Sequence, residues 1–144
     1  MQARRGIAAL CAAAALAAPA PAAAEEEIGA RLSIELNTAR SVEGGCELSF
    51  LAINGHPRDV EAAIFEAVLF DAEGRVERLT LLDFGALPAG RPRVRQFVLP
   101  ETTCDGLGEV LFNGATDCAA GDLGPAACTD GLELRSRAEI GVIG

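Results

Sequence analysis

His56 is the only histidine in this sequence of 144 residues, so a Ser–His–Asp or Cys–His nucleophilic site would have to use it. It lies in the turn-forming stretch Asn54-Gly55-His56-Pro57. No serine occurs in the glycine-flanked context of a nucleophile elbow. A histidine in such a turn is typical of a solvated surface residue. The sequence therefore predicts a protein that is not an enzyme and that carries no cofactor.

Four cysteines, Cys46, Cys104, Cys118 and Cys128, are separated by 58, 14 and 10 positions. Structural zinc sites usually take cysteines in pairs that are two residues apart, so this spacing does not favour a four-thiolate zinc site. Thiol redox proteins use a Cys-x-x-Cys motif, which the sequence does not contain. An even number of cysteines in a small exported domain predicts two disulfides instead.

Several aspartates lie near these cysteines, and carboxylates gathered at one end of a domain are able to hold calcium. Their spacing matches no calcium-binding loop, and acidic loop residues are usually just solvated, so no metal ligand is assigned. They nevertheless suggest an alternative function, a carrier of a small ligand or of a metal ion such as calcium or copper. The residues are Asp105, Asp117, Asp122 and Asp130.

Arg91, Arg93 and Arg95 occupy every second position, which places their guanidinium groups on one face of a strand. Because arginine pairs well with carboxylates, this stripe suits docking to an acidic partner or an anion. The alternative is a solvent-facing stripe that pairs with acidic neighbours such as Glu77 across the sheet. Charges in that position also protect an edge strand from aggregation.

The first 24 residues have the layout of a cleaved secretory signal peptide. Arg4 and Arg5 precede an apolar run over residues 7–18, and small residues end the segment at Ala24. A membrane span needs about 20 apolar residues, and no stretch of the chain is that long. Cys11 falls inside the segment that is discarded.

Residues 25–144 are therefore expected to be a single mature domain without a membrane span. The residues after Arg5 match the twin-arginine motif poorly, so the general secretory (Sec) route is favoured. All 12 basic residues are arginine and the chain is rich in alanine and glycine. That bias is typical of GC-rich bacterial genomes, which makes the expected compartment a periplasm.

The mature part has 120 residues, with 10 arginines against 21 carboxylates and a net charge of −11. A chain this acidic repels a phosphate backbone, which excludes nucleic acid as a partner. The sequence has no Trp and no Tyr, so it also lacks the stacking surfaces of nucleic-acid and sugar binders. The length supports one domain with one core.

Alternating apolar and polar residues, interrupted by turn-forming residues, predict seven short strands. The hairpin around Asp71-Ala72-Glu73-Gly74 is the best defined, because Asp suits the start of a type I turn and Gly its left-handed fourth position. Residues 115–127 are predicted to be loop. The expected strands are 31–36, 46–53, 62–70, 75–82, 91–99, 107–113 and 131–140.

Seven strands in a chain of this length predict an all-β, immunoglobulin-like β-sandwich with Greek-key connections. In that topology the second and fifth strands are antiparallel neighbours. Cys46, at the start of one, would then lie beside Cys104, just after the end of the other. Cys118 and Cys128 would close the loop between the last two strands. A different strand order would change both pairings.

One further pattern consists of Phe50, Asn54, Leu69-Phe70-Asp71, Gly74-Arg75-Val76, Pro88-Ala89-Gly90 and Phe97. With these residues, 46–97 resembles a bacterial immunoglobulin-like module. It is similar to FxLyD-like extracellular domains and to small exported alphaproteobacterial proteins of unknown function. The resemblance covers about half of the mature chain, and the two C-terminal cysteines depart from it. It implies a fold and a location and brings no catalytic residues.

Together these features predict an exported, periplasmic, non-enzymatic binding or accessory module that docks onto an envelope protein. The expected contact is a sheet edge or the loop end closed by the second disulfide. Arg91, Arg93 and Arg95 are the candidate partner-binding residues.

Overall fold

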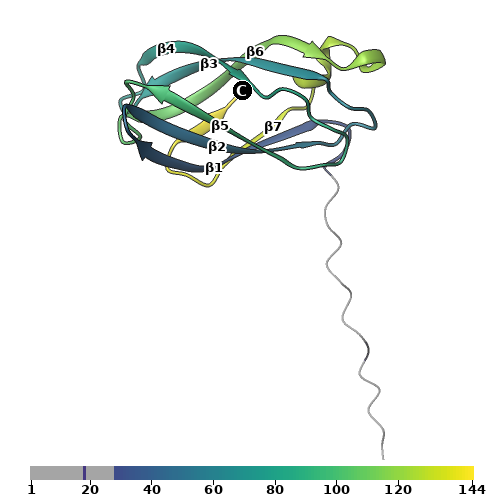
Figure 1. Ribbon diagram of the computed structural model, residues 1–144, viewed down its shortest axis with the longest axis horizontal. Coiled ribbons are helices and arrows are strands. Elements are labelled where there is room, and N and C mark those ends of the chain that lie inside the picture. The colour runs from purple at the N-terminus through teal and green to yellow at the C-terminus, as the bar shows by residue number, and fades with distance from the viewer. Residues whose placement is uncertain (1–17, 19–27) are drawn as a thin grey trace, which may run out of the picture.

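The computed structural model describes residue 18 and residues 28–144. The strands, all within the second range, form two β-sheets packed face to face as a β-sandwich (Figure 1). The predicted leader, residues 1–24, lies outside the described residues except for Ala18. In the described part, no helix is both long and apolar enough to cross a membrane. The elements are β1 (Leu32–Val42), β2 (Gly45–Asn54), β3 (Ala62–Asp71), β4 (Val76–Asp83), β5 (Arg93–Pro100), β6 (Leu107–Ala119), the 3-10 helices η1 (Gly121–Leu123) and η2 (Pro125–Cys128), β7 (Glu133–Ser136) and β8 (Gly141–Ile143).

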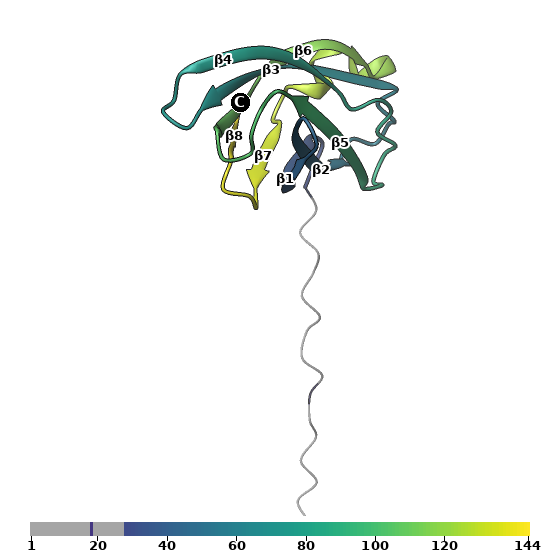
Figure 2. The ribbon, with the colours of Figure 1, turned by 60° about the vertical axis from the view of Figure 1, so that its left-hand side comes forward.

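Each sheet contains four strands. Sheet 1 has the order β5-β2-β1-β7, and sheet 2 has the order β4-β3-β6-β8. Figure 2 shows the two layers, with β4, β3 and β6 above and β7, β1, β2 and β5 below. Most neighbours are antiparallel, but β7 runs parallel to β1 and β8 runs parallel to β6. The edge strands β4 and β5 follow one another along the chain, in different sheets.

The second and fifth strands are antiparallel neighbours, as the sequence predicts, and their register pairs Cys46 with Leu99. Cys104 follows the end of β5 and is joined to Cys46 by a disulfide with a Cα–Cα distance of 5.1 Å. Gly45 allows the start of β2 to lie close to the end of β5, because a Cβ at this position would collide with the carbonyl group of Leu99. The second disulfide joins Cys118 to Cys128. Both pairings are those expected from the sandwich topology.

Five of the six phenylalanines form the centre of the core between the sheets. Phe84 contacts four others, with ring centroids 5.2–6.1 Å apart in tilted or edge-to-face geometry. Such pairs contribute beyond the area that they bury. Apolar residues from both sheets surround this cluster. The five phenylalanines are Phe50, Phe65, Phe84, Phe97 and Phe112.

The sixth and seventh expected strands differ from the structure. The sixth was expected to stop at Asn113-Gly114, but β6 continues to Ala119. The register of β6 with β3 shifts at the turn residues, and the pairing of the two strands then continues until Ala62 lies opposite Ala119. Part of the expected loop at 115–127 is therefore strand, and most of the rest forms η1 and η2.

Only Glu133–Ser136 of the seventh expected strand, 131–140, is strand (β7), and a further strand, β8, begins after its expected end, at Gly141. β7 pairs with β1 in sheet 1, and β8 pairs with β6 in sheet 2. Between them the Ser136 hydroxyl donates to the carbonyl of Ile140 at 2.6 Å and accepts from the amide of Ala138 at 3.1 Å. These bonds fold the crossing segment tightly, so eight strands replace the seven that were expected.

Candidate functional site

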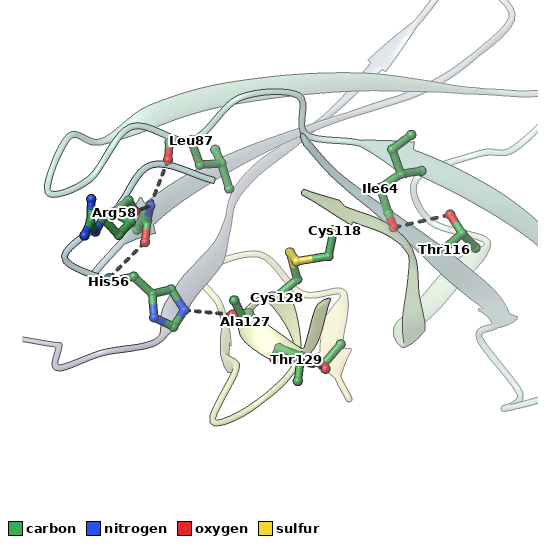
Figure 3. Close-up of a disulfide and its surroundings, with 11 residues drawn as sticks. His56, Arg58, Ile64, Leu87, Thr116, Cys118, Ala127, Cys128 and Thr129 are labelled. Carbon is green, nitrogen blue, oxygen red and sulfur yellow. Dashed lines mark hydrogen bonds between the residues drawn. A yellow bond between two sulfur atoms is a disulfide. The ribbon is translucent and has the colours of Figure 1, made fainter. Parts of the chain in front are cut away.

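His56 is buried, which corrects the expectation of a solvated turn histidine. The residue is 8% exposed, and its Nε2 donates to the carbonyl oxygen of Ala127 at 2.8 Å (Figure 3). Its backbone amide donates to Oδ1 of Asn54 at 2.9 Å. Asn54 is itself fully buried and donates to the carbonyls of Arg58 and Leu87. The only histidine therefore holds loops together.

The disulfide between Cys118 and Cys128 fixes helix η2 against the end of β6 (Figure 3). Cys128 is fully buried, and the loop that it closes contains Asp122. The carboxylate of Asp122 lies 3.6 Å from the guanidinium of Arg58, with both side chains mostly exposed. Within residues 28–144, no three His, Cys, Asp or Glu side chains come together in a way that would hold a metal ion.

The three arginines do not form one solvent-facing stripe. Arg91 precedes β5, whereas Arg93 and Arg95 lie on the side of β5 that carries Phe97 and faces the other sheet. The predicted pairing with Glu77 across a sheet is wrong, because Glu77 belongs to β4 of sheet 2. In the described part of the chain, none of the three forms an ion pair within 4.0 Å.

Arg95 and Arg78 instead bridge the edge strands β5 and β4. Nε of Arg95 donates to the carbonyl of Phe84 at 2.6 Å, and one Nη donates to the carbonyl of Ala86 at 2.8 Å. In the opposite direction, Arg78 donates to the carbonyl of Pro100 and to the hydroxyl of Thr102, both at 2.7 Å. The two bridges close this side of the sandwich, so the Arg95 guanidinium is committed to the fold.

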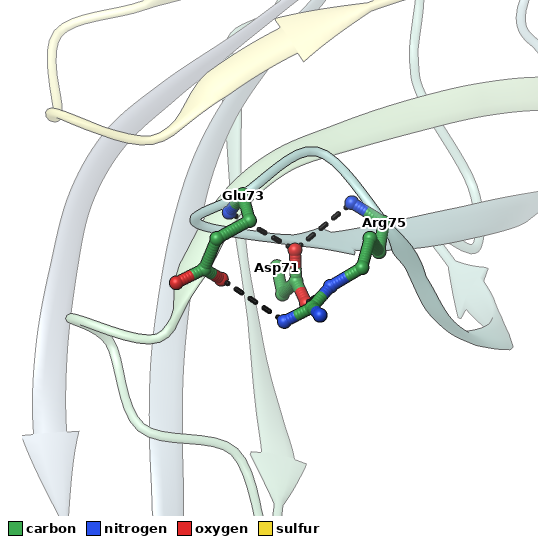
Figure 4. Close-up of polar contacts among 3 residues, drawn as sticks. All are labelled: Asp71, Glu73 and Arg75. Carbon is green, nitrogen blue, oxygen red and sulfur yellow. Dashed lines mark hydrogen bonds and ion pairs between the residues drawn. The ribbon is translucent and has the colours of Figure 1, made fainter.

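The turn between β3 and β4 places three charged side chains at one end of the sandwich. Oδ1 of Asp71 accepts from the amides of Glu73 and Arg75, at 3.0 and 2.9 Å, and Oδ2 accepts from Nε of Arg75 at 2.9 Å (Figure 4). The backbone bond from Arg75 is the main reason that the pKa of Asp71 is lowered. This carboxylate stabilises the turn.

Sheet 2 carries exposed apolar residues on the face that points away from the core. Register places Leu79 of β4 beside Val68 of β3, Val68 beside Leu111 of β6, and Leu111 beside Ile143 of β8. Leu79 and Ile143 are 55% and 44% exposed, and their neighbours cover Val68. We call these four residues the apolar row. It runs across all four strands.

The positions beside the apolar row add further exposed apolar side chains. Leu81 lies on one side, opposite Glu66, and Val76 lies on the other, opposite Phe70. Leu81 and Val76 are both 59% exposed. Polar side chains border the row at the middle of the face, where Asn113 donates to Glu66 at 2.7 Å. Exposed apolar side chains therefore lie on both sides of the apolar row along β4.

The outer face of sheet 1 has a different character. Val94 and Val98 of β5 are also exposed, but Gln96 between them donates to Ser49 of β2 at 3.0 Å. Strands β1, β2 and β7 of that sheet, and the residue after β7, carry ion pairs. These pairs are Arg40–Glu47, Arg135–Glu133 and Arg137–Glu35. The apolar row thus distinguishes sheet 2 from sheet 1.

Sequence reasoning missed the apolar row. Leu79 and Leu81 alternate with polar residues in a strand that was predicted, so the strand itself was visible. Their alignment with Leu111 and Ile143 depends on strand order and register, which separate segments of sequence do not encode. Comparison with protein-family models, with curated proteins and with solved structures finds no match for the chain. The resemblance to FxLyD-like domains therefore stays a prediction.

Proposed function

We propose that this protein is an exported, non-enzymatic binding module that works in the periplasm and docks onto a protein of the cell envelope. The apolar row is the observation that carries the proposal. Contiguous exposed apolar surface on a small domain marks interaction sites, because removing it from water is favourable. Leu79 and Ile143 are its most accessible members and would contribute most of the newly buried area.

Export is supported by the leader layout and by the two disulfides, which persist in oxidising compartments. Mass spectrometry of the chain recovered from a periplasmic extract should give a mature protein that begins at Glu25. Arg4→Lys/Arg5→Lys should leave export unchanged, as expected for the general secretory route. A full-length chain that stays in the cytoplasm would contradict export.

Arg91 and Arg93 form a second candidate contact, since they stand at the start of the edge strand β5 and lack ion-pair partners among residues 28–144. This contact would suit an acidic partner. Arg95 is left out of it because its guanidinium already binds backbone carbonyls. The double variant Arg91→Glu/Arg93→Glu separates this candidate from the apolar row.

Site-specific photo-crosslinking in cells tests the docking surface. A photo-reactive side chain replaces Leu79 in one variant and Val94 in a matched control of similar exposure on sheet 1. We expect a covalent adduct with one envelope protein from position 79 and none from position 94. The adduct should persist in the Arg91→Glu/Arg93→Glu background. Adducts from position 94 alone, or their loss in the arginine variant, would move the contact to β5.

A further inference from the structure

We infer that the apolar row binds a basic polypeptide surface, in which apolar side chains are flanked by Lys or Arg. This inference rests on the proposed function and names the chemistry of the partner at the same site. It is carried by the charges around the row, which are all of one sign on the outer face of sheet 2.

Four carboxylates surround the apolar row on that face. On one side of the apolar row, Glu66 lies two residues before Val68 in β3, opposite Leu81. On the other side, Glu109 lies two residues before Leu111 in β6, opposite Phe70 and Gly141. Asp83 and Asp117 both lie opposite Ile64, which is four residues before Val68 in β3. We call these four residues, Glu66, Asp83, Glu109 and Asp117, the acidic rim.

The negative charge continues past the start of β4. A hollow beside that strand is lined by Glu77 and Glu101 together with the Asp71 and Glu73 carboxylates of the β3–β4 turn. The guanidinium of Arg75 lies 2.9 Å from the Asp71 carboxylate and 3.5 Å from that of Glu73, and it offsets part of their charge. Glu77 and Glu101 therefore extend the acidic surroundings of the row toward the edge of the sandwich.

Positive charge is missing from the outer face of sheet 2. Arg78 is the only basic residue in β3, β4, β6 and β8, and its guanidinium reaches across to Pro100 of sheet 1. By contrast, the carboxylates of sheet 1 face arginines, as in the pairs Arg40–Glu47 and Arg137–Glu35. Among residues 28–144, none of the four rim carboxylates forms an ion pair, so no arginine in that range neutralises the charge of the acidic rim.

This charge pattern favours a basic partner over a second copy of the chain. A two-fold dimer through sheet 2 would bring two acidic rims together, and like charges facing each other in an interface cost free energy. An anionic lipid surface would be repelled in the same way. A basic rim on a partner protein would instead fix the register and speed the encounter, while the apolar row provides the buried area.

Nuclear magnetic resonance titration of the purified mature chain tests the chemistry with defined probes. One synthetic peptide has leucines flanked by lysines, and a second has the same leucines flanked by glutamates. The lysine peptide should shift the amide signals of Leu79, Val68, Leu111 and Ile143, and the glutamate peptide should not. The variant Leu79→Asn/Ile143→Asn should lose these shifts, whereas Val94→Asn/Val98→Asn on sheet 1 should keep them.

Neutralising the rim measures its share of the affinity. Glu66→Gln/Glu109→Gln/Asp117→Asn should weaken lysine-peptide binding about tenfold, since each exposed charge pair contributes about half a kcal/mol. The matched control Glu43→Gln/Asp130→Asn/Glu139→Gln removes three exposed charges elsewhere and should change affinity less than twofold. Equal effects of the two triple variants, or equal binding of both peptides, would overturn the inference but not the docking proposal.

A dimer is the competing outcome. Sedimentation analysis of the mature chain should show a monomer at micromolar concentration. Self-association that Leu79→Asn/Ile143→Asn abolishes would overturn the basic partner and assign the row to a second copy. Absence of any adduct from position 79 in cells, with adducts from another surface, would overturn the docking surface itself.

Discussion

Nε2 of His56 donates a hydrogen bond to the carbonyl oxygen of Ala127, 71 positions further along the chain. Because a carbonyl oxygen only accepts, this bond requires a proton on Nε2. The bond links the loop after β2 to the helix η2 that the second disulfide holds. Loops at this end of the sandwich are thus joined by one covalent bond and one buried hydrogen bond.

Replacing His56 should therefore lower the free energy of unfolding by more than is expected for an exposed residue in a turn. His56→Phe keeps a ring of similar size but leaves the buried carbonyl of Ala127 without a donor. We expect a loss of about 1–3 kcal/mol in the free energy of unfolding, measured with urea. Arg58→Ala, an exposed change in the same loop, is the control and should cost less than about 1 kcal/mol. Equal losses would show that the hydrogen bond is unimportant.

The two disulfides should contribute unequally to stability. In the loop-entropy model, the Cys46–Cys104 bond, which spans 58 positions, stabilises by about 4 kcal/mol, and the Cys118–Cys128 bond, which spans 10, by about 3 kcal/mol. Urea unfolding of the two double Cys→Ala variants measures both contributions. A larger loss from the shorter loop would mean that native packing around Cys128, rather than chain entropy, dominates.

Arg95 should matter for stability far more than Arg93, although both lie on the same side of β5. Arg95→Met removes the donors to Phe84 and Ala86 and should lower the free energy of unfolding by about 1–2 kcal/mol. Arg93 donates only to the carbonyl of its neighbour Pro92, so Arg93→Met should change it by less than about 0.5 kcal/mol. Thermal unfolding of the two variants side by side distinguishes a bridge between sheets from a general effect of charge.

Asp71 should make the stability of the domain depend on pH at the acid end. Its pKa is lowered from 3.8 in the folded state, so its contribution is complete above pH 3.8 and is lost as the pH falls through the lower, folded-state pKa. Asp71→Asn should be less stable than the parent chain near neutral pH, and the difference should shrink on acidification. Urea midpoints measured as a function of pH test this. A constant difference, matching that of Asp130→Asn, would rule it out.

Much of the sheet architecture followed from local sequence. The Asp71-to-Gly74 turn forms between β3 and β4 as expected, with the amide of Gly74 donating to the carbonyl of Asp71 at 3.0 Å and Gly74 at a positive φ. The Cys46–Cys104 bond followed from the pairing of the second and fifth strands. The turn depends on residues within a few positions of one another, whereas the disulfide pairing also required an assumed strand order, because 58 positions separate its two cysteines.

Other local signals were overridden by tertiary contacts. Asn113-Gly114 is a strong turn signal, yet β6 passes through it because β3 offers hydrogen-bonding partners on both sides of the irregularity. His56 looked like a surface residue and is buried because η2 folds over it. The stripe Arg91-to-Arg95 looked like one solvent face, but β5 turns Arg93 and Arg95 toward the edge of the other sheet.

The amino-acid sequence alone was enough to predict the β class, the positions of most strands and the strongly acidic charge of the chain. Those properties come from residue types and from spacings of two to a few residues. Which side chains share a surface depends on how the strands pack together. Leu79, Leu111 and Ile143 align because strand order and register place β4, β6 and β8 in one sheet, and that order depends on packing among segments far apart in the chain.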